Sequence, residues 1–144
     1  MPTIDRPGKA RLAFDSGLTV ANVFERLARS GADRVLVEED DGRILTIGEA
    51  ADLVARWAGA IRDGIEPGEM VIVATPNGYD QLLLCAAVGR AGGIAAPVND
   101  RLTTDEIDHI VADSGARMVI RDAADLPEGL HPVTTDPGVD PSSV

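Results

Sequence analysis

The residues best placed to do chemistry lie in the loop after a short apolar run, Met70 to Ala74. Thr75, Asn77 and Gly78 supply small polar groups and free backbone amides just before a helical pattern that starts at Tyr79. The junction between a parallel strand and a helix N-terminus is where α/β folds commonly bind anions. The three residues are therefore candidate anion-binding residues, and the alternative is a simple capped turn.

No standard phosphate motif strengthens this candidate. The sequence contains neither GxGxxG nor GxxxxGK[ST], and its only lysine is Lys9. The glycine-rich stretch Gly89 to Gly93 ends a helical pattern instead of following a strand. Chain reversal and close packing explain its glycines better than phosphate binding does.

Two stretches of the sequence contain enough potential ligands to hold a metal in principle. Glu38 to Asp41 are consecutive residues of a turn, which rarely converge on one ion, so a solvated loop is expected. Asp105, Asp108 and His109 lie within one helical turn, but such a face is usually a polar exterior. We predict no metal site.

Nucleophilic catalysis is not indicated either. Cys85 lies within the apolar pattern of a helix, and neither His109 nor His131 is placed near it in the sequence. A buried structural thiol is the expected role. No Ser, His and Asp combination with triad character is present, so we predict no catalytic residue in this chain.

Composition limits the partners. The 144 residues suffice for one core, and a net charge of -11 with a pI near 4.4 disfavours nucleic acids and anionic membranes. The single cysteine fits a reducing compartment, and the N-terminus lacks the apolar core of a secretory signal. The longest apolar stretch, Leu82 to Val88, is too short to span a bilayer. We expect a cytoplasmic protein.

The elements that must position the loop form a βαβ unit. Met70 to Ala74 is the first strand, and a helix from Tyr79 follows until Gly92-Gly93 ends it. Ile94 to Pro97 is the next strand, parallel to the first because the helix is a crossover. The expected buried stripe of the helix consists of Leu82, Leu83, Ala86, Ala87 and Ala91.

The segments before this unit predict a helix and a hairpin. Residues 1–17 form an extended or disordered lead-in that attaches through Leu12 and Phe14. Thr19 is a good N-cap for a helix that ends at Gly31, with the stripe Val20, Val23, Phe24, Leu27 and Ala28. Arg34 to Glu38 and Arg43 to Leu45 flank Asp40-Asp41-Gly42, which indicates a hairpin.

Two capping boxes mark further helices. Thr46 and Glu49 open a helix to about Asp63, in which Trp57 is a core anchor and the stripe is Ile47, Ala50, Ala51, Val54, Trp57, Ala58 and Ile61. Thr103 and Glu106 open another, closed at Gly115, and the strand Arg117 to Arg121 follows. Residues 123–144 are a proline-rich tail or linker.

These elements predict a three-layer α/β fold: a mostly parallel sheet with flanking helices, plus a small N-terminal hairpin. The α/β subdomain covers residues 18–122, between the lead-in 1–17 and the tail 123–144. The strands Met70 to Ala74, Ile94 to Pro97 and Arg117 to Arg121 should form the sheet.

From Ile44 to Asp122 the sequence resembles the N-terminal part of the adenylate-forming (AMP-binding) superfamily, of the acyl-CoA synthetase and fatty-acid-CoA ligase type. Individually weak landmarks carry the resemblance by their order and spacing. They are Leu45-Thr46, Gly64 to Glu69, Pro76-Asn77, Arg90 to Gly93, Pro97 to Asn99, Leu102-Thr103 through Glu106, and Asp113 to Ala116.

The resemblance implies a ligase that uses ATP and magnesium to join a carboxylate to AMP and then passes the acyl group to coenzyme A. The family's phosphate loop, aromatic-Gly-x-Thr-Glu segment, ribose-binding Asp and catalytic Lys have no matching positions here. We therefore expect this chain alone to be inactive and to bind no ATP, Mg or CoA. The alternative is a non-catalytic interaction module or split subunit, with the remainder of a synthetase or a second copy as its partner.

Overall fold

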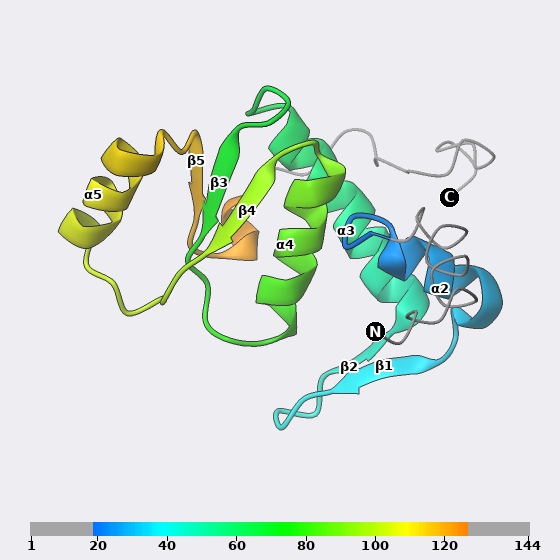
Figure 1. Cartoon of the computed structure of the whole chain (residues 1–144). Coiled ribbons are helices and arrows are strands. Elements are labelled where there is room, and N and C mark those ends of the chain that lie inside the picture. The colour runs from blue at the N-terminus through cyan, green and yellow to red at the C-terminus, as the bar shows by residue number, and fades with distance from the viewer. Residues whose placement is uncertain (1–18, 127–144) are drawn as a thin grey trace, which may run out of the picture.

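The computed structural model describes residues 19–126, which form two sheets and four α-helices. Figure 1 shows the three-stranded sheet in the middle, with α5 on one side and α4 followed by α3 on the other. This is the predicted three-layer α/β arrangement. The expected lead-in, with Leu12 and Phe14, lies outside the described residues, as does the tail beyond residue 126.

The sheet has the strand order β4-β3-β5, and both pairings are parallel. Its strands are β3 (Met70–Val73), β4 (Ile94–Pro97) and β5 (Met118–Ile120). The crossover from β3 to β4 is α4 (Tyr79–Arg90), and the crossover from β4 to β5 is α5 (Thr104–Ser114). The predicted βαβ unit and the mutually parallel strands are thus confirmed.

Successive side chains along β3 point to opposite faces of the sheet and belong to two separate core clusters. Val71 and Val73 belong to a cluster with residues of α3 and α4, whereas Ile72 and Ala74 pack with Ile107 of α5. Because β3 is central and parallel, it is apolar on both faces. Val71, Ile72, Val73 and Ala74 are accordingly all buried. The unbroken apolar run in the sequence reflects this position.

The predicted hairpin is formed by β1 (Val35–Glu38) and β2 (Ile44–Thr46), which pair antiparallel with a register shift between Val35 and Val37. Gly42 at its turn has φ 87°, a left-handed conformation that glycine adopts at little cost. The hairpin leads directly into α3 (Ile47–Arg62), whose N-terminus it adjoins in Figure 1.

Both predicted capping boxes are confirmed. The Thr46 hydroxyl accepts from the Glu49 amide at the start of α3, and the Thr103 hydroxyl accepts from the Glu106 amide at the start of α5. Each glutamate side chain accepts from the backbone N–H of its threonine in return. Gly115 closes α5 in the left-handed conformation, as expected.

The glycines after α4 serve chain reversal and close packing, as the sequence predicts. Gly92 has φ 90° and reverses the chain. A Cβ at Gly93 would lie 2.7 Å from the Ile65 side chain and 3.1 Å from the Glu69 carbonyl oxygen, so the backbone packs closely there.

The predicted start of the first helix is wrong. The Thr19 amide donates to the Asn22 side chain over 2.7 Å and the Asn22 amide donates back to the Thr19 carbonyl, which makes residues 19–22 a turn. Helix α2 (Val23–Gly31) begins after it, without a side-chain cap. Of the predicted stripe, Val20 and Leu27 are exposed and Phe24 is buried.

The predicted stripe of α4 is wrong at Leu82, which is 48% exposed, whereas Leu83 is fully buried. In α3, Ala51 and Trp57 are half-buried against the core and the other stripe residues are buried. After β5, the short 3-10 helix η1 (Ala123–Asp125) continues the folded part, with Ala123 and Leu126 packed against the α3 and α4 side of the core.

Arg90 is a buried charge that the sequence did not reveal, with a side chain only 1% exposed. Its Nε donates to the Ala21 carbonyl over 2.8 Å, and its guanidinium lies 3.5 Å from the Glu25 carboxylate. Burial lowers the pKa of Arg90, and the charge of Glu25 acts in the opposite sense. The contacts tie α2 to the C-terminal end of α4.

Candidate functional site

A pocket of about 370 Å³ opens at the carboxyl edge of the sheet, beside the N-terminus of α4. Its walls come from four segments: the hairpin turn, the loop Thr75 to Gly78, the first turn of α4, and residues 121–123 after β5. The sequence-predicted candidates Thr75, Asn77 and Gly78 all line it. The structure thus brings the three residues together at one opening.

The loop before α4 is held by its own helix. Gln81 Nε2 donates to the Thr75 carbonyl over 3.2 Å and so fixes the start of the loop against the first turn. Gly78 is the N-cap residue, and no side chain accepts a hydrogen bond from the first-turn amides at this cap. This differs from α3 and α5, whose threonine caps satisfy one amide each.

Thr75 differs from its two neighbours in burial. The residue is 3% exposed, and its Oγ1 has no hydrogen-bond partner among the residues that the structure describes. Asn77 and Gly78 are exposed at the mouth of the pocket. A buried hydroxyl without a partner is uncommon in folded proteins and calls for an explanation.

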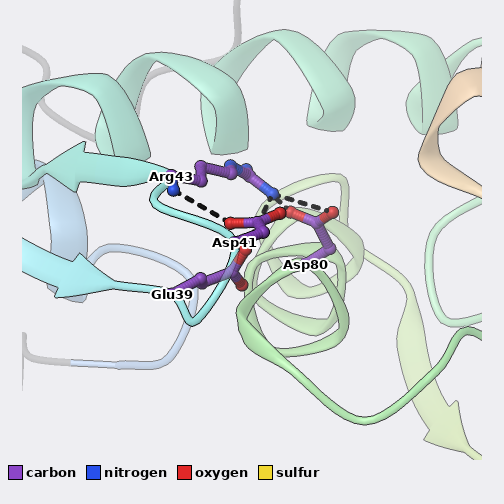
Figure 2. Close-up of polar contacts among 4 residues, drawn as sticks. All are labelled: Glu39, Asp41, Arg43 and Asp80. Atoms are coloured by element: carbon purple, nitrogen blue, oxygen red, sulfur yellow. Dashed lines mark hydrogen bonds and ion pairs between the residues drawn. The ribbon is translucent and has the colours of Figure 1, made fainter.

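An ion pair that sequence reasoning missed forms one wall. Figure 2 shows Arg43 of the hairpin reaching Asp80 in the first turn of α4. The guanidinium donates to both carboxylate oxygens, over 3.0 and 3.2 Å, and also lies 3.7 Å from Glu39. The hydrogen bonds to Asp80 raise the pKa of Arg43 above its ordinary value, although partial burial opposes them.

The pair joins two segments that are 37 residues apart in the sequence. The hairpin turn positions Arg43 because Asp41 accepts from its backbone amide over 2.9 Å, as Figure 2 also shows. No local pattern could have identified Asp80 as the partner. The only signal was the placement of a basic residue at a hairpin tip that is otherwise acidic.

The fourth wall contributes one charge of each sign. Arg121 is exposed and forms no ion pair within residues 19–126. The Asp122 carboxylate accepts from the Ala124 amide over 2.9 Å, so it caps η1. Altogether the pocket is lined by two guanidinium groups and three carboxylates, those of Glu39, Asp80 and Asp122.

The other candidates are scattered over the molecule. Asp105, Asp108 and His109 are exposed on α5, and Glu38, Asp40 and Asp41 are exposed near the hairpin turn. Within the described part of the chain, no group of three or more His, Cys, Asp or Glu could hold a metal ion. No helix in residues 19–126 is long and apolar enough to cross a membrane.

Cys85 is half-buried and packs against the core on the α3 and α4 side of the sheet, whereas His109 belongs to α5 on the other side. Burial raises the pKa of the Cys85 thiol. Both features disfavour a thiolate nucleophile and agree with a structural role.

Comparison with known proteins identifies a family to which the chain is similar. The family model described as AMP-binding enzyme matches residues 23–141. A feruloyl-CoA synthase from Amycolatopsis sp is 41% identical over 80 residues, which are 55% of this chain and 16% of the relative. The 4-coumarate–CoA ligase-like 9 of Oryza sativa subsp. japonica is 36% identical over 112 residues, 76% of this chain and 20% of the relative.

Solved structures agree with the sequence relatives. The N-terminal domain of FACL13 from Mycobacterium tuberculosis superimposes with a TM-score of 0.64 at 26% identity, covering 71% of this chain and 26% of that one. A benzoate CoA ligase from Burkholderia xenovorans LB400 gives 0.65 at 25% identity, covering 74% and 22%. The matched segments therefore make up between 16% and 26% of the length of these proteins.

Proposed function

The chain belongs to the AMP-binding enzyme family, and from this membership we propose that it supplies the leading α/β unit of an ATP-dependent acyl-CoA ligase. Such a ligase forms an acyl-adenylate and then an acyl thioester. The observation that carries the proposal is the agreement between the matched family segment and the three-layer fold, whose structural neighbours include an N-terminal domain. Acyl-CoA ligase-like sequence relatives support the same reaction class.

The complete reaction requires ATP, magnesium and coenzyme A, and the described residues do not fit a triphosphate and its metal. Phosphoryl and adenylyl transfer need cations and aimed donors around the phosphates. Residues 19–126 contain no lysine, Arg43 is already bound to Asp80, and three carboxylates line the pocket. We propose that these cofactors bind to other parts of the ligase and that the 144-residue chain alone is inactive.

Pyrophosphate release tests this proposal. The purified chain is incubated with ATP, Mg²⁺ and, separately, a range of aromatic and aliphatic carboxylates, with the carboxylate omitted as the control. We expect no carboxylate-dependent pyrophosphate. The same chain expressed together with the coding sequence that follows it should release pyrophosphate with at least one carboxylate. Activity of the chain alone would contradict the proposed inactivity, and continued silence of the longer protein would contradict the ligase assignment.

The second candidate is a non-catalytic interaction module or split subunit that completes a partner chain. Exposed large apolar side chains favour it: Leu82 on α4, Ile94 on β4 and Val119 on β5 are 48%, 53% and 36% exposed. Ile94 and Val119 lie on the same face of the sheet, and exposed apolar surface is a usual feature of interaction sites. The partner would be the remainder of a synthetase or a second copy of this chain.

Thermal stability separates the two candidates. A chain that binds nucleotide should be stabilised saturably by ATP, AMP or coenzyme A, by about 2.7 kcal/mol at a hundredfold excess over Kd. A split subunit should respond to the separately expressed remainder and not to the nucleotides. Sedimentation velocity over a range of concentrations detects the self-dimer, and a chain that stays monomeric and responds to no remainder would contradict the second candidate.

A further inference from the structure

We infer that the pocket at the N-terminus of α4 binds a compact oxyanion, a carboxylate or phosphate group, through Thr75, the first-turn amides of α4 and Arg121. The inference goes beyond the proposed ligase assignment and does not rest on it. The residues that line this opening carry three kinds of donor: a hydroxyl, backbone N–H groups and a guanidinium.

The first donor group is the end of the helix. Helix α4 has 12 residues, and its first-turn amides receive no side-chain cap at Gly78. Unpaired N–H groups and the helix dipole make such an end attractive to anions. A Cβ placed on Gly78 would meet nothing within 4 Å, so there is open space in front of the helix end.

Thr75 gives an independent indication of a ligand. The residue is only 3% exposed, and it lines the same pocket. Its Oγ1 lacks a hydrogen-bond partner among the described residues. Leaving a buried hydroxyl unpaired costs stability, so a ligand acceptor at this point would remove an existing penalty.

The charges of the pocket limit what kind of anion fits. Arg43 holds Asp80 at 3.0 Å and Glu39 at 3.7 Å, which neutralises the hairpin wall in part. Arg121, without an ion pair in residues 19–126, is the cation available to a ligand. Two cations against three carboxylates leave a lining charge of -1. A small group of low charge therefore fits better than a free triphosphate.

Amide chemical shifts test the site directly. The full chain, labelled with ¹⁵N, is titrated with sodium acetate and separately with inorganic phosphate, at constant ionic strength and pH. We expect saturable shifts concentrated at Thr75 and at the first-turn amides of Tyr79, Asp80 and Gln81. Tighter binding of acetate would identify a carboxylate as the ligand group, and tighter binding of phosphate would identify a phosphate.

Two variants and a matched control decide the roles of the side chains. Thr75→Val keeps the shape and removes Oγ1, and Arg121→Gln removes the cation. Each should raise the apparent Kd of the tighter anion about tenfold. Arg56→Gln, an equal charge change on the exposed face of α3, should leave the Kd within twofold.

Stability measurements on the same variants complete the test. Because Oγ1 has no partner in the described structure, Thr75→Val should not lower the urea midpoint of the free chain. A lower midpoint would show that the hydroxyl already has a structural partner and would overturn the inference. Shifts that do not saturate, or that are spread evenly over the chain, would overturn it as well.

Discussion

The two faces of the three-stranded sheet differ in how many buried residues pack against them. On the face toward α3 and α4, Val71 and Val73 join a cluster of 15 buried residues. On the face toward α5, Ile72, Ala74 and Ile107 are the buried members of a second, much smaller cluster. Figure 1 shows the same asymmetry, with α3 and α4 stacked on one side and α5 alone on the other.

The exposed apolar residues of the sheet belong to the thinly covered face. Ile94 pairs with Met70, and Val119 pairs with Ile72, so alternation places both on the side of α5. Parallel sheets normally have both faces covered. The difference shows that most of the buried core lies on one face, while the other face retains exposed apolar side chains at Ile94 and Val119.

The largest expected effect is on the deeply covered face. Leu83→Ala should lower the free energy of unfolding by about 2 to 5 kcal/mol, because this α4 side chain is fully buried in the cluster with residues of α3 and β3. Urea denaturation followed by circular dichroism measures it. The matched control is the adjacent Leu82→Ala, on a residue 48% exposed, which should stay within about 0.5 kcal/mol. Equal losses for the two leucines would contradict the assigned orientation of α4.

A smaller effect is expected on the other face. Ile107 is 3% exposed, but most of its apolar neighbours are only partly buried, so α5 can shift to close a cavity. Ile107→Ala should therefore cost about 2 kcal/mol, the lower end of the range for such truncations. The same urea titration provides the value. A loss greater than that of Leu83→Ala would reverse the comparison between the faces.

The cap of α5 should contribute about 1 kcal/mol. Thr103→Ala removes the hydroxyl that accepts from the Glu106 amide over 3.2 Å, which leaves a first-turn donor without its cap. Amide hydrogen exchange should accelerate within α5 and remain unchanged in α4. Thr104→Ala, at the next position and outside the cap, is the control. Uniform acceleration over both helices would mean that the two layers unfold together.

The smallest effects are expected at the exposed sheet residues. Ile94→Thr and Val119→Thr keep β-branched side chains and should each change the free energy of unfolding of the isolated chain by less than about 0.5 kcal/mol. Both substitutions should instead weaken any association with a second copy or a synthetase remainder, measured by sedimentation velocity. A loss of stability in the monomer would show that this face is already packed.

Much of the fold follows from local patterns. The bounds of β4 agree with the predicted strand Ile94 to Pro97, and both capping boxes begin their helices at the expected threonines. Gly92 and Gly115 adopt the left-handed conformation that a helix end requires. These features depend on residues a few positions apart, so a single sequence contains the information.

Two details of the helices were predicted wrongly, the start of α2, where local hydrogen bonds form a turn, and the buried stripe of α4, where distant neighbours decide. Helix α2 starts after a turn between Thr19 and Asn22, and the start of that helix is tied down by Arg90, from α4. Leu82 and Leu83 are the same residue type in the same apolar run, so the predicted buried stripe of α4 included both, although only Leu83 is buried. Only the position of the neighbouring helices distinguishes them.

The candidate site also has a part that the sequence predicted and a part that it did not. Thr75, Asn77 and Gly78 were predicted as a group because strand, loop and helix are contiguous. Arg43 and Arg121 were not predicted as lining residues, since the hairpin and the end of β5 reach the pocket only through the packing of whole elements.

The sequence by itself determined the order of the elements, the caps of α3 and α5, the parallel sense of the central strands and the family to which the chain belongs, because periodicity, turn chemistry and ordered landmarks are local or linear. The tertiary structure alone decided which apolar residues are buried, the bidentate contact of Arg43 with Asp80, and the burial of Arg90 against Glu25. Those outcomes depend on the distance between groups far apart in the chain, and burial and charge pairing are set by that distance.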